Sequence, residues 1–257
     1  MSWFELVAIF AAGVGAGTIN AVVGSGTLIT FPVLLAFGFN PIVANVSNNV
    51  GLVSGGVSGT LGYRAELSGQ GRRIRLLAPM SLLGAVTGAL LLLRLPAAAF
   101  SAIVPVLLAI SLVLVVTQPR MQAAVARRRE LDPEASGRGH QSLAMAGTYV
   151  AGAYGGYFGA AQGVLLVGLL GSLLPEPLQR VNALKNLLSL VVNSVAALVF
   201  LAVARDLIDW RVVLLIALGS TVGGVLGARY GRRLAPRALR ALIVVVGIVA
   251  IVRVLAS

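Results

Sequence analysis

Long apolar segments without a charged side chain dominate the chain. No Asp, Glu, Lys or Arg occurs in residues 6–63, 141–175, 186–204 or 212–228. A helix needs about 20 apolar residues to cross a hydrocarbon core of about 30 Å. The pattern therefore predicts an all-α, polytopic transmembrane helical bundle whose outer surface contacts the lipid bilayer.

The apolar stretches divide into ten segments, of which the second and the seventh are short. They cover residues 4–23, 27–37, 42–62, 76–93, 96–118, 143–160, 164–174, 179–203, 211–228 and 236–255. Each short segment has eleven residues, and a helix of that length rises about 16 Å, or half a bilayer. Because each follows a glycine, we predict a half-helix joined to the segment before it. Eight principal helices remain, four in each half.

The two halves of the chain share a residue pattern at a fixed offset. Gly15, Gly26, Asn45 and Asn49 each match a residue of the same type 137 positions later. Broken hydrophobic segments at corresponding places in two repeats are typical of secondary transporters, whose substrate site lies where the broken segments meet. We therefore predict two transmembrane repeats, residues 1–118 and 142–257, joined by a polar basic linker, residues 119–141.

Arginine placement bears on how the repeats cross the membrane. Residues 64–75, 120–138 and 229–240 carry four, five and five arginines. Positively charged loops face the cytoplasm. All three stretches lie on that side if each broken helix dips into the membrane and returns. Each half then crosses the membrane three times. The two repeats are therefore inverted relative to each other, and both termini are periplasmic. Four simple crossings per half would place the third stretch on the opposite side. The first interpretation is favoured, and the second stays open.

Composition narrows the chemistry that the chain can perform. The net charge is +12, but the arginines lie at the ends of apolar segments, so membrane flanks rather than nucleic acid explain them. Cysteine is absent, and His140 is the only histidine. No catalytic residue, metal site or cofactor is therefore expected, since an enzyme would need a nucleophile with a base or a set of metal ligands. The ATPase motif Gly-x-x-x-x-Gly-Lys-Ser/Thr is also missing.

Two glycine-containing breaks occupy equivalent places in the halves. Gly24-Ser25-Gly26-Thr27 precedes one half-helix, and Ala161-Gln162-Gly163-Val164 precedes the other. Glycine lets the backbone leave the helix and lets another group approach closely. The N–H groups at the start of a half-helix and the positive end of its dipole favour an anion. A simple packing kink is the alternative.

Asparagines and the only lysine form a second group of candidates. Asn45, Asn48 and Asn49 lie in the first half, and Asn182, Lys185 and Asn186 lie in the second. A lysine within a membrane segment usually faces a cavity or a partner. All eight acids lie near segment ends, so a substrate anion is the natural counter-charge for Lys185. Alternatively, Lys185 snorkels to the interface and the asparagines bond across helices.

Tyr157 lies on the second broken helix, where it would line the pathway or pack between helices. The full set of predicted substrate-binding residues is Asn20, Gly24, Ser25, Gly26, Thr27, Asn45, Asn48, Asn49, Tyr157, Gln162, Gly163, Asn182, Lys185 and Asn186.

At these positions the chain resembles the sulfite exporter TauE/SafE family. Residues 17–32 and 44–49 look like the glycine-rich segment and the asparagine element of the family, and residues 152–163 and 182–186 look like their second-half counterparts. The second motif, Ala161-Gln162-Gly163, departs from the commoner Gly-Gly-Gly form. The resemblance implies a multi-pass protein of the bacterial inner membrane that exports sulfite or organosulfonate-like anions. Transport of another small solute, a non-transporting membrane subunit and a homo-oligomer stay open.

Overall fold

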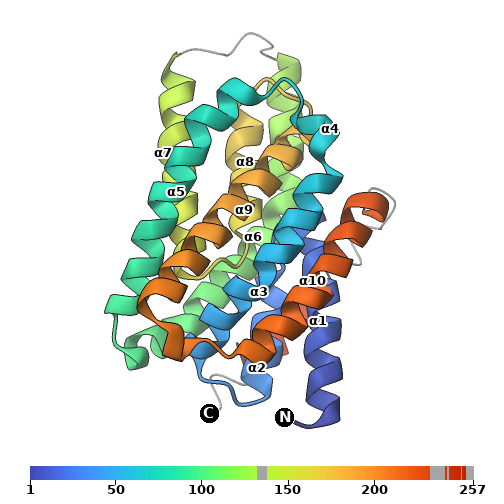
Figure 1. The fold of residues 1–257 in the computed structure, drawn as a ribbon. Coiled ribbons are helices and arrows are strands. Elements are labelled where there is room, and N and C mark those ends of the chain that lie inside the picture. Colours follow the sequence, from blue (N-terminus) through green and yellow to red (C-terminus); the bar gives the residue numbers. More distant parts are fainter. Residues whose placement is uncertain (132–137, 232–240, 242, 250, 253–257) are drawn as a thin grey trace.

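The computed structural model describes residues 1–131, 138–231, 241, 243–249 and 251–252, which fold into a bundle of helices (Figure 1). The helices are α1 (Trp3–Val22), α2 (Thr27–Ala36), α3 (Pro41–Gly62), α4 (Arg64–Leu67), α5 (Gly71–Arg94), α6 (Ala97–Leu131), α7 (Arg138–Tyr157), α8 (Gln162–Leu173), α9 (Leu178–Val203), η1 (Arg205–Leu207) and α10 (Trp210–Tyr230). These residues contain no strand, so the predicted all-α fold is confirmed. The tenth predicted segment, residues 236–255, lies partly outside the described residues.

Polar side chains fix where several helices begin. Before α1, Ser2 Oγ accepts the Glu5 N–H at 3.3 Å, and the Glu5 carboxylate accepts the Ser2 N–H at 2.9 Å. Asn40 caps α3, and Asp209 caps α10. Each cap satisfies backbone donors that a helix start leaves without an internal partner.

Each broken helix pair dips into the bundle and returns to the end where it began. The rings of Phe4, near the start of α1, and Phe37, just after α2, lie 6.1 Å apart. Likewise, the start of α7 and the end of α8 line one cavity, with Gln141 and Leu174 on its wall. The helices α3, α5 and α6 run between the two ends, and α9 and α10 do the same (Figure 1). This path matches the favoured interpretation of the arginine pattern, and the inverted relation of the repeats stays a prediction.

The two halves of the sequence interlock in space. First-half α1 packs along second-half α10, and second-half α7 packs along first-half α5. Glycines allow the contact, since a Cβ on Gly17 would lie 2.2 Å from the Ser220 carbonyl oxygen and one on Gly88 would lie 2.0 Å from that of Ala153. The described residues of the two halves therefore pack against each other rather than apart, and the repeat boundaries stay a prediction. Helix α6 also continues through much of the predicted linker, as far as Leu131.

Long apolar helices with exposed outer faces make this a multi-pass membrane protein. Within the described part of the chain, five segments are long and apolar enough to cross a bilayer: Trp3–Val22, Gly71–Arg94, Ala97–Ala124, Leu178–Val203 and Trp210–Tyr230. Leu198 is 65% exposed on α9, and Leu214 is 60% exposed on α10. Such apolar faces suit lipid rather than water. The helices α2 and α8 are shorter, as the half-helix interpretation requires.

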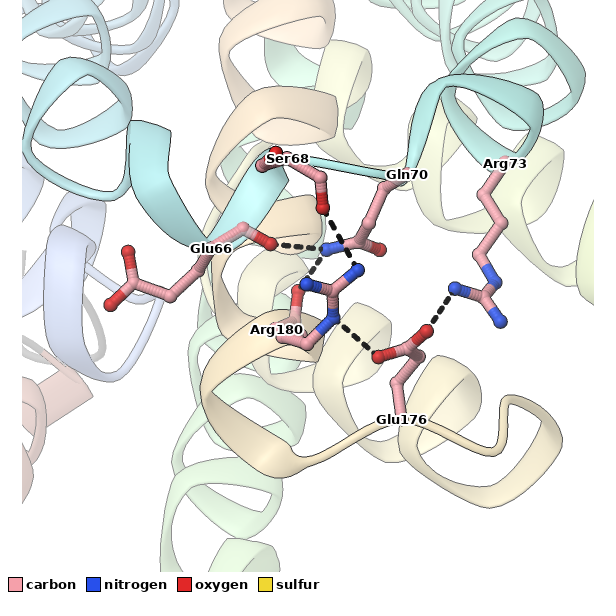
Figure 2. Close-up of polar contacts among 6 residues, drawn as sticks. All are labelled: Glu66, Ser68, Gln70, Arg73, Glu176 and Arg180. Carbon is pink, nitrogen blue, oxygen red and sulfur yellow. Dashed lines mark hydrogen bonds and ion pairs between the residues drawn. The ribbon is translucent and has the colours of Figure 1, made fainter.

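A polar cluster ties the halves together at the end that carries α4 (Figure 2). Glu176, between α8 and α9, accepts hydrogen bonds from Arg73 on α5 and from Arg180 on α9. Arg180 also donates to the Ser68 carbonyl at 3.0 Å, and Gln70 donates to the Arg180 carbonyl at 3.0 Å. Burial alone would raise the pKa of Glu176, but the two arginines hold that pKa below its usual value.

The described ends of the bundle give a labelling test of topology. The chain has no cysteine, so single cysteines can be introduced at exposed positions, Ala65→Cys at the α4 end and Ala98→Cys at the opposite end. The positive-inside rule places the α4 end in the cytoplasm. We expect a membrane-impermeant maleimide to label Ala98→Cys, but not Ala65→Cys, from the periplasm of intact cells. The opposite labelling would show that the orientation is reversed.

The Glu176 cluster makes stability depend on pH. Because the folded pKa of Glu176 is lowered, its stabilisation is present above the usual glutamate pKa and is lost as pH falls through the folded value. Acidification should therefore lower the Tm of the purified protein more steeply than the Tm of Glu176→Gln. The control Asp206→Asn, at an exposed position, should keep the wild-type pH profile. Parallel profiles for the wild type and Glu176→Gln would contradict this role.

Candidate functional site

The two predicted breaks meet directly through their backbones. The Gly163 N–H donates to the Gly24 carbonyl at 3.0 Å. A Cβ on Gly163 would lie 2.5 Å from Gly24 Cα, closer than real Cβ contacts allow. The prediction that the broken segments of both halves come together is consistent with this contact. In this conformation, however, the N–H of Gly163 faces the other break rather than an open cavity.

The backbone turns in the same left-handed way at equivalent positions of the two breaks. Gly24 has a φ of +91°, and Ala161, 137 residues later, has a φ of +59°. A side chain makes that conformation unfavourable, so Ala161 holds a strained backbone where the first half uses glycine. The offset of 137 residues pairs Ala161 with Gly24, but an alanine in the sequence does not predict a left-handed turn.

Partnerless polar side chains lie at the starts of both half-helices. Ser25 Oγ and Gln162 Nε2, at equivalent positions, are buried without a hydrogen-bond partner in the described part of the chain. Unpaired buried polar atoms are unfavourable and call for an explanation. Gly26 also allows a close approach, because a Cβ there would lie 2.4 Å from the Ala16 carbonyl oxygen. It therefore makes room for α1.

Residues from both halves gather at the end of α1 and form what we call the α1-end cluster. Its members are Asn20, Gly24, Gly163, Asn182, Lys185 and Asn186. The Lys185 ammonium donates to the Asn20 carbonyl at 2.9 Å and to the Ala21 carbonyl at 3.4 Å. Asn182 and Asn186 each donate to the Ala21 carbonyl at 3.2 Å. Second-half side chains thus satisfy carbonyls at the negative end of a first-half helix.

Lys185 is fully buried, with 0% of its surface exposed. Because its ammonium lies against main-chain carbonyls inside the bundle, the snorkelling interpretation is wrong. Asn48 occupies the equivalent position in the first half. Of these two equivalent positions, only the one in the second half therefore carries a positively charged side chain.

The α7-end cluster mirrors this arrangement with neutral groups, and it comprises Thr27, Asn45, Asn48 and Tyr157. Asn45 donates to the Tyr157 carbonyl at 2.9 Å, so a first-half side chain caps the second-half broken helix. Asn48 donates to Thr27 Oγ1 at 3.3 Å and accepts a hydrogen bond from Thr30. The Tyr157 ring packs against Phe100, with the ring centres 5.7 Å apart.

A small polar cavity adjoins the α1-end cluster. Its volume is about 10 Å³, which leaves room for roughly one water molecule. Asn20 and Asn186 line it together with Ser189 and Asn193, which sequence reasoning missed. Both follow Lys185 at intervals of four residues, which places them on the same face of the helix and could have indicated them. Asn49, another predicted residue, is buried, and its side-chain oxygen has no partner among the described residues.

The described side chains contain no group of three or more His, Cys, Asp or Glu that could hold a metal ion. The two clusters themselves consist of amides, a hydroxyl, backbone groups and the ammonium of Lys185.

The chain is similar to a family of membrane transporters. The family model for the sulfite exporter TauE/SafE matches residues 9–254. A probable membrane transporter protein, ORF9, from Sinorhizobium sp is 29% identical over 255 residues, covering 99% of this chain and 94% of that protein. A probable membrane transporter protein from Haemophilus influenzae is 28% identical, covering 87% and 84%. Escherichia coli YfcA, a probable membrane transporter protein, is 26% identical, covering 94% and 86%. No solved structure matches significantly.

The contact between the breaks can be tested with one methyl group. Gly163→Ala would force the two backbones apart, and overpacking of this kind costs about 1–3 kcal/mol. We expect a lower Tm and a strong loss of transport. Gly71→Ala is the matched control, because a Cβ there meets nothing within 4 Å and should be silent. A fully active Gly163→Ala variant would show that the close contact is dispensable.

Proposed function

Because the chain belongs to the sulfite exporter TauE/SafE family of membrane transporters, multi-pass proteins of the bacterial cytoplasmic membrane, we propose that it exports a small anion. The substrate class is sulfite or an organosulfonate-like anion. Transport is secondary, without ATP hydrolysis by this chain. The α1-end cluster, together with Ser25 and Gln162, which adjoin Gly24 and Gly163 in the chain, forms the binding site.

The observation that carries the proposal is the buried ammonium of Lys185. Its described hydrogen-bond partners are the neutral carbonyls of Asn20 and Ala21. A buried charge without an opposite charge is unfavourable, so the site favours a negatively charged ligand over a cation. All eight acidic residues lie near the ends of apolar segments in the sequence.

The anion would take the place of the backbone acceptors that now occupy the site. An oxyanion oxygen can accept from the Lys185 ammonium and from the Gly163 N–H, which at present bond to carbonyl oxygens. Ser25 Oγ and Gln162 Nε2, which have no partner among the described residues, would supply further donors. The anion therefore binds by exchange, and binding separates the two breaks.

This exchange also connects binding to movement. The cavity of about 10 Å³ is too small for a sulfite ion, so the site in this conformation is closed. Separation of the breaks would let each broken pair shift against the opposite half, which is the usual form of alternating access. An inside-negative membrane potential drives an anion outward by about 2.3 kcal/mol per charge per 100 mV, which favours export.

Flux measurements on purified protein in proteoliposomes test the function. Sulfite, sulfate, thiosulfate and small sulfonates would be loaded one at a time, and efflux would be followed under an imposed inside-negative potential. We expect efflux of at least one sulfur oxyanion or sulfonate, accelerated by the potential. No efflux of any of these anions from proteoliposomes that contain folded protein would refute the proposal.

The charge of Lys185 gives a sharper prediction. Lys185→Met keeps the buried stem but removes the ammonium, and it should weaken anion binding by about 2–5 kcal/mol, as does truncating a buried charge pair. Lys185→Arg should restore binding only partly, because a planar fork replaces a compact ammonium. Asn48→Ala, at the equivalent neutral position, is the control and should weaken binding less. Calorimetry on folded variants measures the difference, and unchanged affinity in Lys185→Met would remove Lys185 from the site.

A further inference from the structure

A second, larger cavity lies at the α4 end of the bundle, away from the α1-end cluster. Its volume is about 480 Å³. The first turns of α5 and α7, the end of α8 and the residues next to them form its wall. The lining residues are Gly69, Arg72, Arg73, Leu76, Leu77, His140, Gln141, Ala144, Leu173, Leu174 and Pro175.

The wall of this cavity has two chemical faces. Arg72, Arg73 and His140 provide a basic rim, whereas Leu77 and Leu173 belong to an apolar floor. Arg73 is ion-paired with Glu176, as Figure 2 shows. Arg72 has no ion pair or hydrogen bond within the described ranges of the chain. Of the two lining arginines, Arg72 is therefore the one whose charge is available to bind an anion.

The position of the cavity on the apolar helices and its volume both favour an amphiphilic ligand over a small ion. The cavity lies where the arginine stretch of residues 64–75 meets the apolar run of α5, because Arg72, Arg73 and Leu77 all line it. Leu143 on α7, which precedes the lining residue Ala144 in the chain, is 55% exposed and suits lipid chains. Because both arginines and leucines line it, the cavity can contact a lipid headgroup with one set of side chains and acyl chains with the other. Its volume greatly exceeds that of a sulfite-sized ion, whereas an amphiphile can use both faces.

We propose that this cavity binds an anionic membrane phospholipid, with the phosphodiester on Arg72 and the first carbons of the acyl chains on the leucine floor. The lipid would bridge first-half α5 and second-half α7 and α8, beside the Glu176 cluster. Bound lipid would therefore stabilise the packing of α5 against α7 and α8 at this end of the bundle. The proposal does not depend on the identity of the transported anion.

Native mass spectrometry of the purified full-length protein tests the site. The protein in detergent would be titrated with phosphatidylglycerol, with zwitterionic phosphatidylcholine, and with inorganic phosphate as a competitor. We expect retention of phosphatidylglycerol over phosphatidylcholine, with little competition by millimolar phosphate. Equal retention of the two lipids would overturn the proposal. Efficient displacement by phosphate would instead identify a site for free phosphate, which also overturns it.

Matched arginine variants separate a built site from general surface charge. Arg72→Gln should weaken phosphatidylglycerol retention about fivefold, the effect of one positive charge near an anionic lipid. Arg75→Gln removes the same charge from the same helix but lies outside the cavity wall, so it should change nothing. Equal effects of the two substitutions would overturn the proposal.

A cavity-filling variant tests the apolar face without changing charge. Ala144 is buried in the wall, and Ala144→Leu would occupy part of the floor. Retention of phosphatidylglycerol should fall although Arg72 is intact, and unchanged retention in the folded variant would contradict the role of the floor. If Ala144→Leu does not fold, the comparison of Arg72→Gln with Arg75→Gln decides alone.

Discussion

A helix that breaks inside a membrane leaves backbone donors and acceptors that no water can satisfy. The structure solves this problem across the two halves rather than within them. The Gly163 N–H bonds to the Gly24 carbonyl, Lys185 and its neighbouring asparagines cap the end of α1, and Asn45 caps the end of α7. The packing of α1 on α10 and of α7 on α5 keeps these groups together. Neither half could close its own broken helix in this way.

The same groups that satisfy the backbone give the site its chemistry. A donor that bonds to a main-chain carbonyl can bond equally well to an oxyanion, so ligand binding and closure of the breaks compete for the same atoms. The halves are unequal in one respect, because Lys185 stands where the first half has Asn48. The α1-end cluster thereby carries a positive charge, whereas the α7-end cluster is held by neutral groups alone.

Local patterns predicted much of this arrangement. The two half-helices appear within a few residues of the predicted ranges, since apolar length and glycine position determine where a helix can persist. The partners across the halves could not be predicted, because one sequence does not show which helix faces Asn45 or Lys185. The left-handed turn at Ala161 was also hidden, since alanine seldom adopts it without support from surrounding structure. Ser189 and Asn193 were overlooked although they follow Lys185 at helical spacing. Family membership, by contrast, was evident from the motifs in both halves.

We propose that a small anion binds where the two breaks meet, by displacing the backbone acceptors there. An experimental structure determined with a transported sulfur oxyanion bound would test it most directly. We expect anion density between Lys185, Ser25 and Gln162, with the hydrogen bond between the Gly163 N–H and the Gly24 carbonyl broken. Anion density elsewhere in the protein, with that hydrogen bond intact, would contradict it.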